Sequence, residues 1–143
     1  MHNIHYFSED IEFSLKDQPT ISEWITDIIS SNECQIEEVN YIFCSDEYLL
    51  GINKQYLNHD TYTDIITFDN SSEESLVESD IYISVDRVRE NAAEFNISFD
   101  KELHRVMIHG VLHLLGWEDK SPDDKKRMTE KEDACLSLLS ITN

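Results

Sequence analysis

The sequence predicts an α+β fold in which a small, mostly four-stranded sheet packs against helices. Alternating and β-branched apolar segments, which favour strands, gather in the first 86 residues. Apolar residues spaced three and four apart, which favour helices, lie between these segments and fill the rest of the chain. Because 143 residues supply one hydrophobic core, we expect residues 1–143 to form a single domain.

The N-terminal part is expected to contain one strand followed by one helix. Residues 11–15 alternate apolar and polar side chains, as a half-buried strand does. Thr20 and Glu23 have the spacing of a capping box, in which each side chain bonds the backbone N–H of the other residue. We therefore expect a helix that starts near Thr20 and buries the apolar residues between Trp24 and Ile29.

The next segments predict a strand, a helix and a pair of strands. Residues 38–44 alternate again, and Ser45 is placed to cap a helix that ends before the polar loop 58–63. Residues 64–69 and 80–86 are rich in β-branched and aromatic side chains, and a polar connection separates them. We expect these two segments to pair as neighbouring strands.

The last third of the chain predicts three helices. Apolar residues recur at helical spacing from Asp86 until residues 96–98 interrupt the pattern, and a second helix is expected over about residues 99–115. Ser121 and Pro122 are an N-cap residue and a proline at the first helical position. They mark the start of a final helix.

The net charge of −19 argues against a protein that coats nucleic acid, because phosphate contacts need clustered lysine and arginine. The charge is uneven. Residues 1–86 hold 19 acidic residues against two lysines, whereas residues 87–143 hold 11 acidic residues against nine basic ones. The balanced C-terminal part is either a local site for an anionic substrate or an ordinary solvated surface of mixed charge.

The N-terminus lacks the pattern of a secretory signal and no apolar run is long enough to span a membrane, so we expect a cytoplasmic protein. Cys34, Cys44 and Cys135 are odd in number and lack CxxC spacing. This pattern argues against a disulfide framework and against a thiolate metal site. We expect buried, reduced thiols.

The stretch HGVLHLLGWED, residues 109–119, predicts a metal site on a helix. His109 and His113 are four residues apart, so a helix places both imidazoles on one side, where they can hold one ion. Gly116 allows the helix to end in a left-handed turn, and Asp119 can then return a carboxylate to the same ion. The alternative is that two histidines at this spacing occur by chance as core or surface residues.

The spacing H-x-x-x-H-x-x-G-x-x-D matches the zinc helix of metzincin peptidases, with aspartate as the third ligand. Those peptidases carry a glutamate, the general base, directly after the first histidine, whereas this chain has Gly110. We therefore expect a zincin-like metal helix without peptidase activity. A metal-bound hydroxide or another residue would then act as the base.

The same stretch resembles the motif of the YbeY family of endoribonucleases, which is usually H-G-x-L-H-L-x-G-[YW]-D-H. Residues 52–69 resemble that family's N-x-x-[YF]-R-x-K-D-x-P-T-D-V-L-S-F segment, and residues 78–84 resemble its G-D-I-x-I-S strand. The likeness covers about residues 45–135. It implies a cytoplasmic, zinc-dependent endoribonuclease that cuts single-stranded RNA, matures the 3′ end of small-subunit ribosomal RNA and acts in ribosome quality control. Its implied partners are ribosomal particles or ribosomal proteins.

The chain departs from the family pattern within these motifs. Asp119 stands where the usual third ligand is histidine, which lowers the charge of the metal centre by one unit. Leu57 and His59 stand where the family has arginine and lysine, and leucine cannot make the bidentate phosphate contact of an arginine. His59 is a candidate substitute. The resemblance also places a downstream acid at Glu130.

Two alternatives to the nuclease stay open. A non-catalytic, metal-stabilised factor that binds ribosomal particles would explain the missing arginine. A non-haem iron enzyme shares the His/His/carboxylate ligand set, although its ligands usually lie on strands and both histidines are expected on a helix here. Thr63 and Asp64, at the start of an expected strand, are expected to brace the site rather than to perform chemistry.

Overall fold

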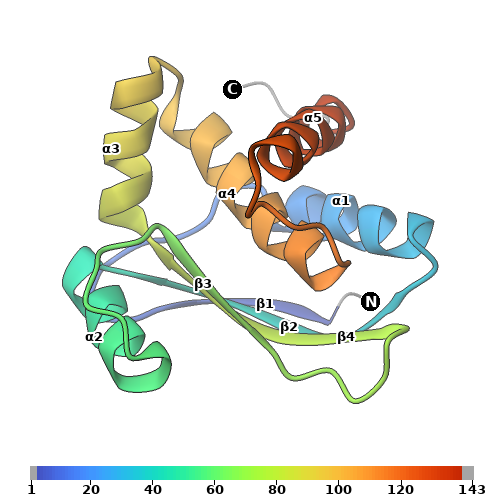
Figure 1. The fold of residues 1–143 in the computed structure, drawn as a ribbon, viewed down its shortest axis with the longest axis horizontal. Coiled ribbons are helices and arrows are strands. Elements are labelled where there is room, and N and C mark those ends of the chain that lie inside the picture. The colour runs from blue at the N-terminus through green and yellow to red at the C-terminus, as the bar shows by residue number, and fades with distance from the viewer. Residues whose placement is uncertain (1–2, 140–143) are drawn as a thin grey trace.

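The computed structural model describes residues 3–139, and Figure 1 shows their helices gathered mainly on one face of a sheet. The elements are β1 (Ile4–Ser8), α1 (Gln18–Ser31), β2 (Gln35–Cys44), α2 (Asp46–Leu57), β3 (Ile65–Asp69), β4 (Leu76–Ser84), α3 (Val85–Phe95), α4 (Phe99–Leu114) and α5 (Pro122–Ser137). The strand order is β1-β2-β4-β3, in which β1, β2 and β4 are parallel and β3 is antiparallel to β4. The predicted α+β class with a four-stranded sheet is confirmed.

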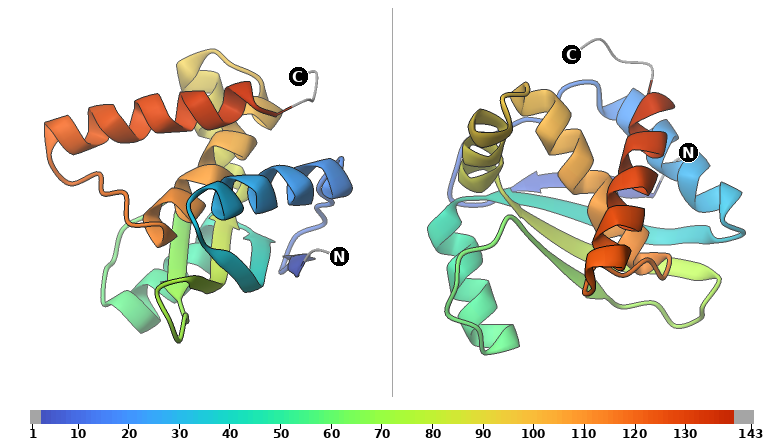
Figure 2. Two further views of the ribbon diagram at one scale, coloured as in Figure 1. Left: turned by 90° about the vertical axis from the view of Figure 1, so that its right-hand side faces the viewer. Right: turned by 45° about the horizontal axis from the view of Figure 1, so that its top comes forward.

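Two hydrophobic clusters lie on the two faces of the sheet. The larger one joins the sheet to α1, α4 and α5, and it buries Tyr41, Phe43 and Ile81 from the strands. The smaller one joins Leu49 of α2 to Ile66 of β3 on the opposite face. Figures 1 and 2 show α2 below the sheet and the other helices above it. Helix α4 therefore runs between the sheet and the outer helix α5.

Helix α4 is buried along most of its length, and this burial fixes the direction in which its C-terminal end points. The Tyr41 hydroxyl of β2 donates a hydrogen bond to the Met107 carbonyl of α4 at 3.1 Å. On the outer side, the Trp24 ring nitrogen of α1 donates to the Cys135 carbonyl of α5 at 2.8 Å. The first bond ties the helix that carries the two motif histidines to the sheet, and the second joins α1 to α5, which both pack on α4.

The strand expected at residues 11–15 is wrong. The first strand is β1, and Asp10, two residues after its end, adopts a left-handed backbone conformation that turns the chain out of the sheet. The alternating residues Phe13 and Leu15 pack on the core from an irregular segment, with the Phe13 ring 4.9 Å from the Phe43 ring. Apolar alternation here reflects burial of side chains without strand pairing.

The capping box expected at Thr20 is also wrong. Helix α1 begins at Gln18, and Asp17 occupies the N-cap position without a side-chain hydrogen bond, so Thr20 already lies in the first turn. Pro19 is tolerated there because the first N–H groups of a helix have no partner within it. The helix itself and its buried residues from Trp24 to Ile29 are as predicted.

The remaining elements agree with the sequence, apart from their ends. The side chains of Ser45 and Ser121 accept hydrogen bonds from backbone N–H groups at the starts of α2 and α5, as their N-cap roles require. The strands over residues 64–69 and 80–86 pair as expected. However, β4 begins four residues earlier, at Leu76, and ends at Ser84, where α3 begins.

All three cysteines are free thiols. Cys44 and Cys135 are buried as expected, whereas Cys34 is partly exposed. Within residues 3–139, the structure contains no helix with the length and apolarity needed to cross a membrane.

The buried histidine of α4, His104, predicts a pH dependence of stability. Burial lowers the pKa of its ring, and the carboxylates of Asp100 and Asp17 offset this effect in part. As the pH falls through about 6.5, the unfolded chain binds a proton that the folded chain does not bind, so the free energy of unfolding falls. We expect His104→Phe to lose less stability than the unmodified protein between pH 7.5 and pH 5. Urea unfolding at both pH values measures this difference, and equal losses would contradict it.

Candidate metal site

His109 and His113 lie on the last two turns of α4, with their ring centroids 4.6 Å apart. The buried side of the helix faces the sheet and α5, so both rings are left at the edge of this layer. Both are partly exposed, with 20% and 34% of their side-chain surfaces accessible. The predicted pairing of two imidazoles on one side of a helix is therefore present.

Gly110 allows α4 to approach the sheet closely beside the first histidine. A Cβ atom at this position would lie 2.9 Å from the Ile65 side chain and 3.1 Å from the Thr67 hydroxyl, both on β3. Such distances are shorter than ordinary van der Waals contacts. Metzincin peptidases carry their general base at the position of Gly110. In this chain that position packs against the sheet and has no room for a side chain, which argues against peptidase chemistry.

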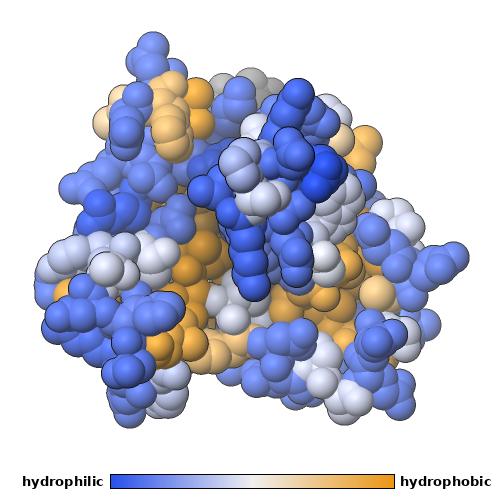
Figure 3. All heavy atoms as spheres, in the orientation of Figure 1, coloured by the Kyte–Doolittle hydropathy of each residue, from blue (hydrophilic) through white to orange (hydrophobic). Residues whose placement is uncertain are grey.

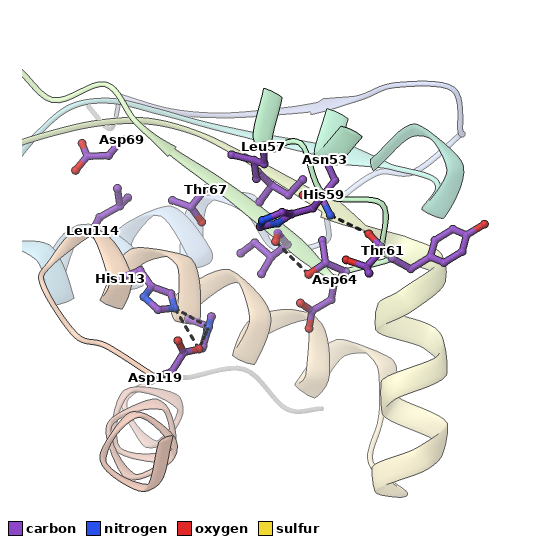
Figure 4. A pocket seen from close by; sticks show the side chains of 15 residues that line it. Asn53, Leu57, His59, Thr61, Asp64, Thr67, Asp69, His113, Leu114 and Asp119 are labelled. Carbon is purple, nitrogen blue, oxygen red and sulfur yellow. Dashed lines mark hydrogen bonds and ion pairs between the residues drawn. The ribbon is translucent and has the colours of Figure 1, made fainter. Parts of the chain in front are cut away.

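Gly116 ends the helix in the predicted left-handed turn, with a φ of +101°. The Gly116 N–H donates to the His113 carbonyl and the Trp117 N–H to the Leu112 carbonyl, each at 3.0 Å. This pair of bonds is a Schellman motif, which requires a residue free to adopt positive φ. The turn sends the chain back, so that Asp119 returns to the two histidines (Figure 4).

Three ligand atoms form a nearly equilateral triangle. The Nε2 atoms of His109 and His113 are 3.0 Å apart, and Oδ2 of Asp119 lies 3.3 Å from the first and 3.4 Å from the second. In a tetrahedral zinc site with bonds of 2.0–2.1 Å, two ligand atoms are about 3.3 Å apart. The donor set and its spacing therefore fit a zinc ion. Asp119 is partly exposed, so one side of the triangle faces solvent.

Glu132 of α5 fixes the orientation of the first histidine. Nδ1–H of His109 donates to Oε2 of Glu132 at 2.5 Å, which leaves the Nε2 lone pair directed at the triangle. Burial alone would lower the pKa of His109, but the hydrogen bond with Glu132 and the charges of neighbouring carboxylates outweigh it and raise the pKa. Because a proton on Nε2 competes with a metal ion, the same contacts favour a cation at this position.

A buried ion-pair network supports Glu132 in turn. Arg105 donates to Glu132 at 3.0 Å and makes two hydrogen bonds to Glu102, at 2.8 and 2.6 Å. Glu102 and Glu132 are 0% and 1% exposed. Both carboxylates raise the pKa of the Arg105 guanidinium, so it stays charged. The network therefore compensates a carboxylate charge directly behind the His109 ring.

The acid behind the site differs from the one that the family resemblance places there. Glu130 is exposed on α5, and Glu132 is the residue that reaches His109. A signal for this exists in the sequence, because Glu132 shares the helical spacing of the buried residues Met128 and Cys135. An acid on the apolar stripe of a helix needs a buried partner.

The triangle lies on the wall of an open pocket with a volume of about 650 Å³. Figure 4 shows His113 and Asp119 on one side of it and Leu57, His59 and Asp64 on the other. Figure 3 shows this face of the molecule hollowed between α2 and α4, with hydrophobic side chains exposed in the hollow. The lining residues are Asn53, Leu57, His59, Thr61, Tyr62, Thr63, Asp64, Ile65, Ile66, Thr67, Asp69, His109, His113, Leu114 and Asp119.

Thr63 and Asp64 lie where β3 enters the pocket. The Asp64 carbonyl accepts a hydrogen bond from the Ser84 N–H at 2.9 Å, and Asn91 donates to the Asp64 carboxylate at 3.2 Å. Burial raises the pKa of this carboxyl, while the charges of His109 and Arg105 lower it in part. Asp64 is thus tied into the fold and also presents a carboxyl group to the pocket.

Comparison with known proteins shows similarity over nearly the whole chain. The Endoribonuclease YbeY family model matches residues 3–140. Proteins named Endoribonuclease YbeY from Cytophaga hutchinsonii and Flavobacterium psychrophilum are 50% and 49% identical over 135 residues, which cover 94% of this chain and 94% and 96% of theirs. The solution structure of TM1509 from Thermotoga maritima has a TM-score of 0.65 and 31% identity, covering 94% of this chain and 87% of that chain.

Proposed function

Because the chain belongs to the Endoribonuclease YbeY family, we propose that it is a metal-dependent hydrolase that cleaves phosphodiester bonds in single-stranded RNA. Its substrate is ribosomal RNA, its role is maturation of the small-subunit 3′ end and ribosome quality control, and its partners are cytoplasmic ribosomal particles or ribosomal proteins. Residues 1–143 act as one hydrolase domain. The observation that carries the proposal is the convergence of three metal-ligand atoms on the wall of an open pocket.

One zinc ion, held by His109, His113 and Asp119, is the proposed cofactor. Two imidazole nitrogens and a carboxylate oxygen form a ligand set that zinc accepts, with further positions left for substrate or water. When bound, the ion supplies Lewis acidity toward a phosphodiester oxygen and lowers the pKa of a water ligand. Glu132 and Arg105 hold the His109 ring in the orientation that this role needs.

Asp64 is the residue to which we assign proton transfer, a role beyond the bracing expected from sequence. Its carboxyl lines the same pocket as His109 and His113 without belonging to the ligand triangle. The raised pKa makes the Asp64 carboxylate a stronger proton acceptor than an exposed aspartate. The hydrogen bond from Asn91 keeps the carboxylate in place.

Cleavage of a labelled single-stranded RNA by three forms of the protein tests this function. We expect the unmodified protein to cleave and a chelator to stop it, whereas His109→Ala loses both metal and cleavage. Asp64→Asn is expected to retain stoichiometric metal and to cleave roughly 100- to 10,000-fold more slowly. Equal background cleavage by the unmodified protein and His109→Ala would contradict an enzyme.

A non-catalytic factor that binds ribosomal particles is the second candidate function. The observation that favours it is that the described residues lining the pocket include no lysine or arginine. The non-haem iron alternative is not favoured, because both histidines lie on a helix and not on strands. The cleavage experiment separates the nuclease from the binding factor, since a binding factor gives equal background in all three forms.

A further inference from the structure

The outer edge of strand β3 borders the pocket that holds the ligand triangle. β3 is the last strand in the order β1-β2-β4-β3, so it pairs with β4 on one side only. Four of its residues line the pocket, namely Ile65, Ile66, Thr67 and Asp69. We propose that Thr67 binds a phosphate group of single-stranded RNA and so positions the RNA along β3, past the ligand triangle. The proposal rests on the proposed function and names how the same pocket binds its substrate.

The register of β3 against β4 determines which backbone groups point away from the sheet. The Ser84 N–H donates to the Asp64 carbonyl at 2.9 Å, so residue 64 is a hydrogen-bonded position of this antiparallel pair. Such positions alternate with positions whose N–H and C=O groups point away from the neighbouring strand. The N–H groups of residues 65, 67 and 69 therefore point to the outer edge, where the described part of the chain supplies no further strand.

Thr67 offers a second hydrogen-bond donor at this edge. Its hydroxyl faces α4, 3.1 Å from the position that a Cβ atom of Gly110 would occupy. The side chain is partly exposed, and among residues 3–139 its hydroxyl has no hydrogen-bond partner. Figure 4 shows Thr67 in the pocket between Leu57 and His113. Because the free N–H and the free hydroxyl belong to one residue, one phosphate group can accept hydrogen bonds from both.

The charges around Thr67 favour uncharged donors as the protein's contacts to a phosphate. Asp64, Asp69 and Asp119 line the pocket, whereas its described lining includes no lysine or arginine. Backbone N–H groups and threonine hydroxyls are common donors to the phosphates of nucleic acids. A bound metal ion would offset the negative charge of the carboxylates nearby. The edge of β3 thus supplies the phosphate contacts that cationic side chains do not supply here.

Thr67→Val removes the hydroxyl and keeps the β-branched shape that packs beside Gly110. For a short single-stranded RNA, we expect KM to rise roughly 2- to 10-fold and kcat to stay within a factor of about two, because the hydrogen bond holds substrate and transition state alike. Zinc content and the salt dependence of KM are expected to stay unchanged, since no charge is lost. The matched control is Thr20→Val, which removes an exposed hydroxyl from α1, outside the pocket, and is expected to leave KM unchanged.

A backbone ester tests the N–H donor separately. The α-hydroxy analogue of valine at position 67 replaces the N–H by an ester oxygen, and we expect KM to rise a further 2- to 10-fold, roughly, above that of Thr67→Val. The control is the α-hydroxy analogue of phenylalanine at position 68. The Phe68 N–H points to β4 by the same register, so this change is expected to lower stability in urea and to leave KM unchanged.

Fluorescence anisotropy of the labelled RNA distinguishes failure of this subsite from failure of the proposed function. We expect Thr67→Val to weaken RNA binding by the same factor by which it raises KM. Equal KM and equal binding for the unmodified protein, Thr67→Val and the ester at position 67 would overturn the subsite. The edge would then be left to an extended peptide, the other ligand that adds to an open strand. RNA binding that depends on Thr67 without any cleavage would support the subsite and overturn the proposed nuclease.

Discussion

Replacement of Glu132 by alanine is expected to lower zinc affinity roughly 10- to 100-fold, although Glu132 is not a proposed ligand. The Nδ1–H of His109 then loses its acceptor, so neither the tautomer nor the ring orientation stays fixed. We also expect the free energy of unfolding to fall by about 3 kcal/mol, because Arg105 keeps its charge with one of its two partners gone. Competition with a chromophoric chelator and urea unfolding of the metal-free protein measure the two effects.

Glu130→Ala is the matched control for this change. It removes an acid from the same helix two residues away, but from the exposed side. We expect its zinc affinity to stay close to that of the unmodified protein and its stability to change by less than about 0.5 kcal/mol. Equal zinc affinities of Glu132→Ala and Glu130→Ala would contradict the positioning role of Glu132.

Replacement of Asp119 by alanine is expected to lower zinc affinity by roughly 100-fold or more, since it removes one of three protein ligands and its negative charge. The fold is expected to tolerate this change, because Asp119 is partly exposed and lies in the turn after α4. Asp119→His, which supplies another nitrogen donor, should retain stoichiometric zinc. Inductively coupled plasma analysis and chelator competition on both variants measure this.

Glu118→Ala serves as the control for Asp119→Ala. Glu118 is the preceding acid and is exposed, and it is not part of the ligand triangle. Loss of zinc affinity in both variants to the same degree would indicate a general effect of negative charge. Loss confined to Asp119→Ala would indicate direct coordination.

The starts of α2 and α5 were predictable because their chemistry is local. Ser45 and Ser121 bond N–H groups three residues ahead, so the sequence contains both partners within one turn. The same holds for the ligand helix, where the spacing of His109, His113 and Gly116 determines which side chains meet. Asp119 follows within one short turn, and the structure brings it to the histidines.

Features that depend on distant parts of the chain could not be predicted in this way. Strand β1 pairs with β2 more than thirty residues later in the chain, and its five residues are too few to establish a period-two pattern. Residues 11–15 showed strand-like alternation, but they form a loop whose apolar side chains pack on the core. The contact of Glu132 with His109 spans 23 residues and depends on how α5 crosses α4.

Leu57 illustrates a different limit. Sequence reasoning treated residue 57 as a lost phosphate contact, because arginine is the expected residue there. The structure shows that Leu57 lines the same pocket as the candidate metal ligands, with its side chain exposed. Which side chains of a loop face a site depends on the path of the chain, and the spacing of apolar residues in the sequence does not predict it.

X-ray absorption spectroscopy at the zinc edge, on the protein purified with its metal, tests the central claim most directly. We expect one zinc ion per chain, with two imidazole nitrogens and oxygen ligands at about 2.0–2.1 Å. A sulfur ligand at about 2.3 Å, which would indicate one of the three free cysteines, would contradict the site. Fewer than two imidazoles around the ion would contradict it as well.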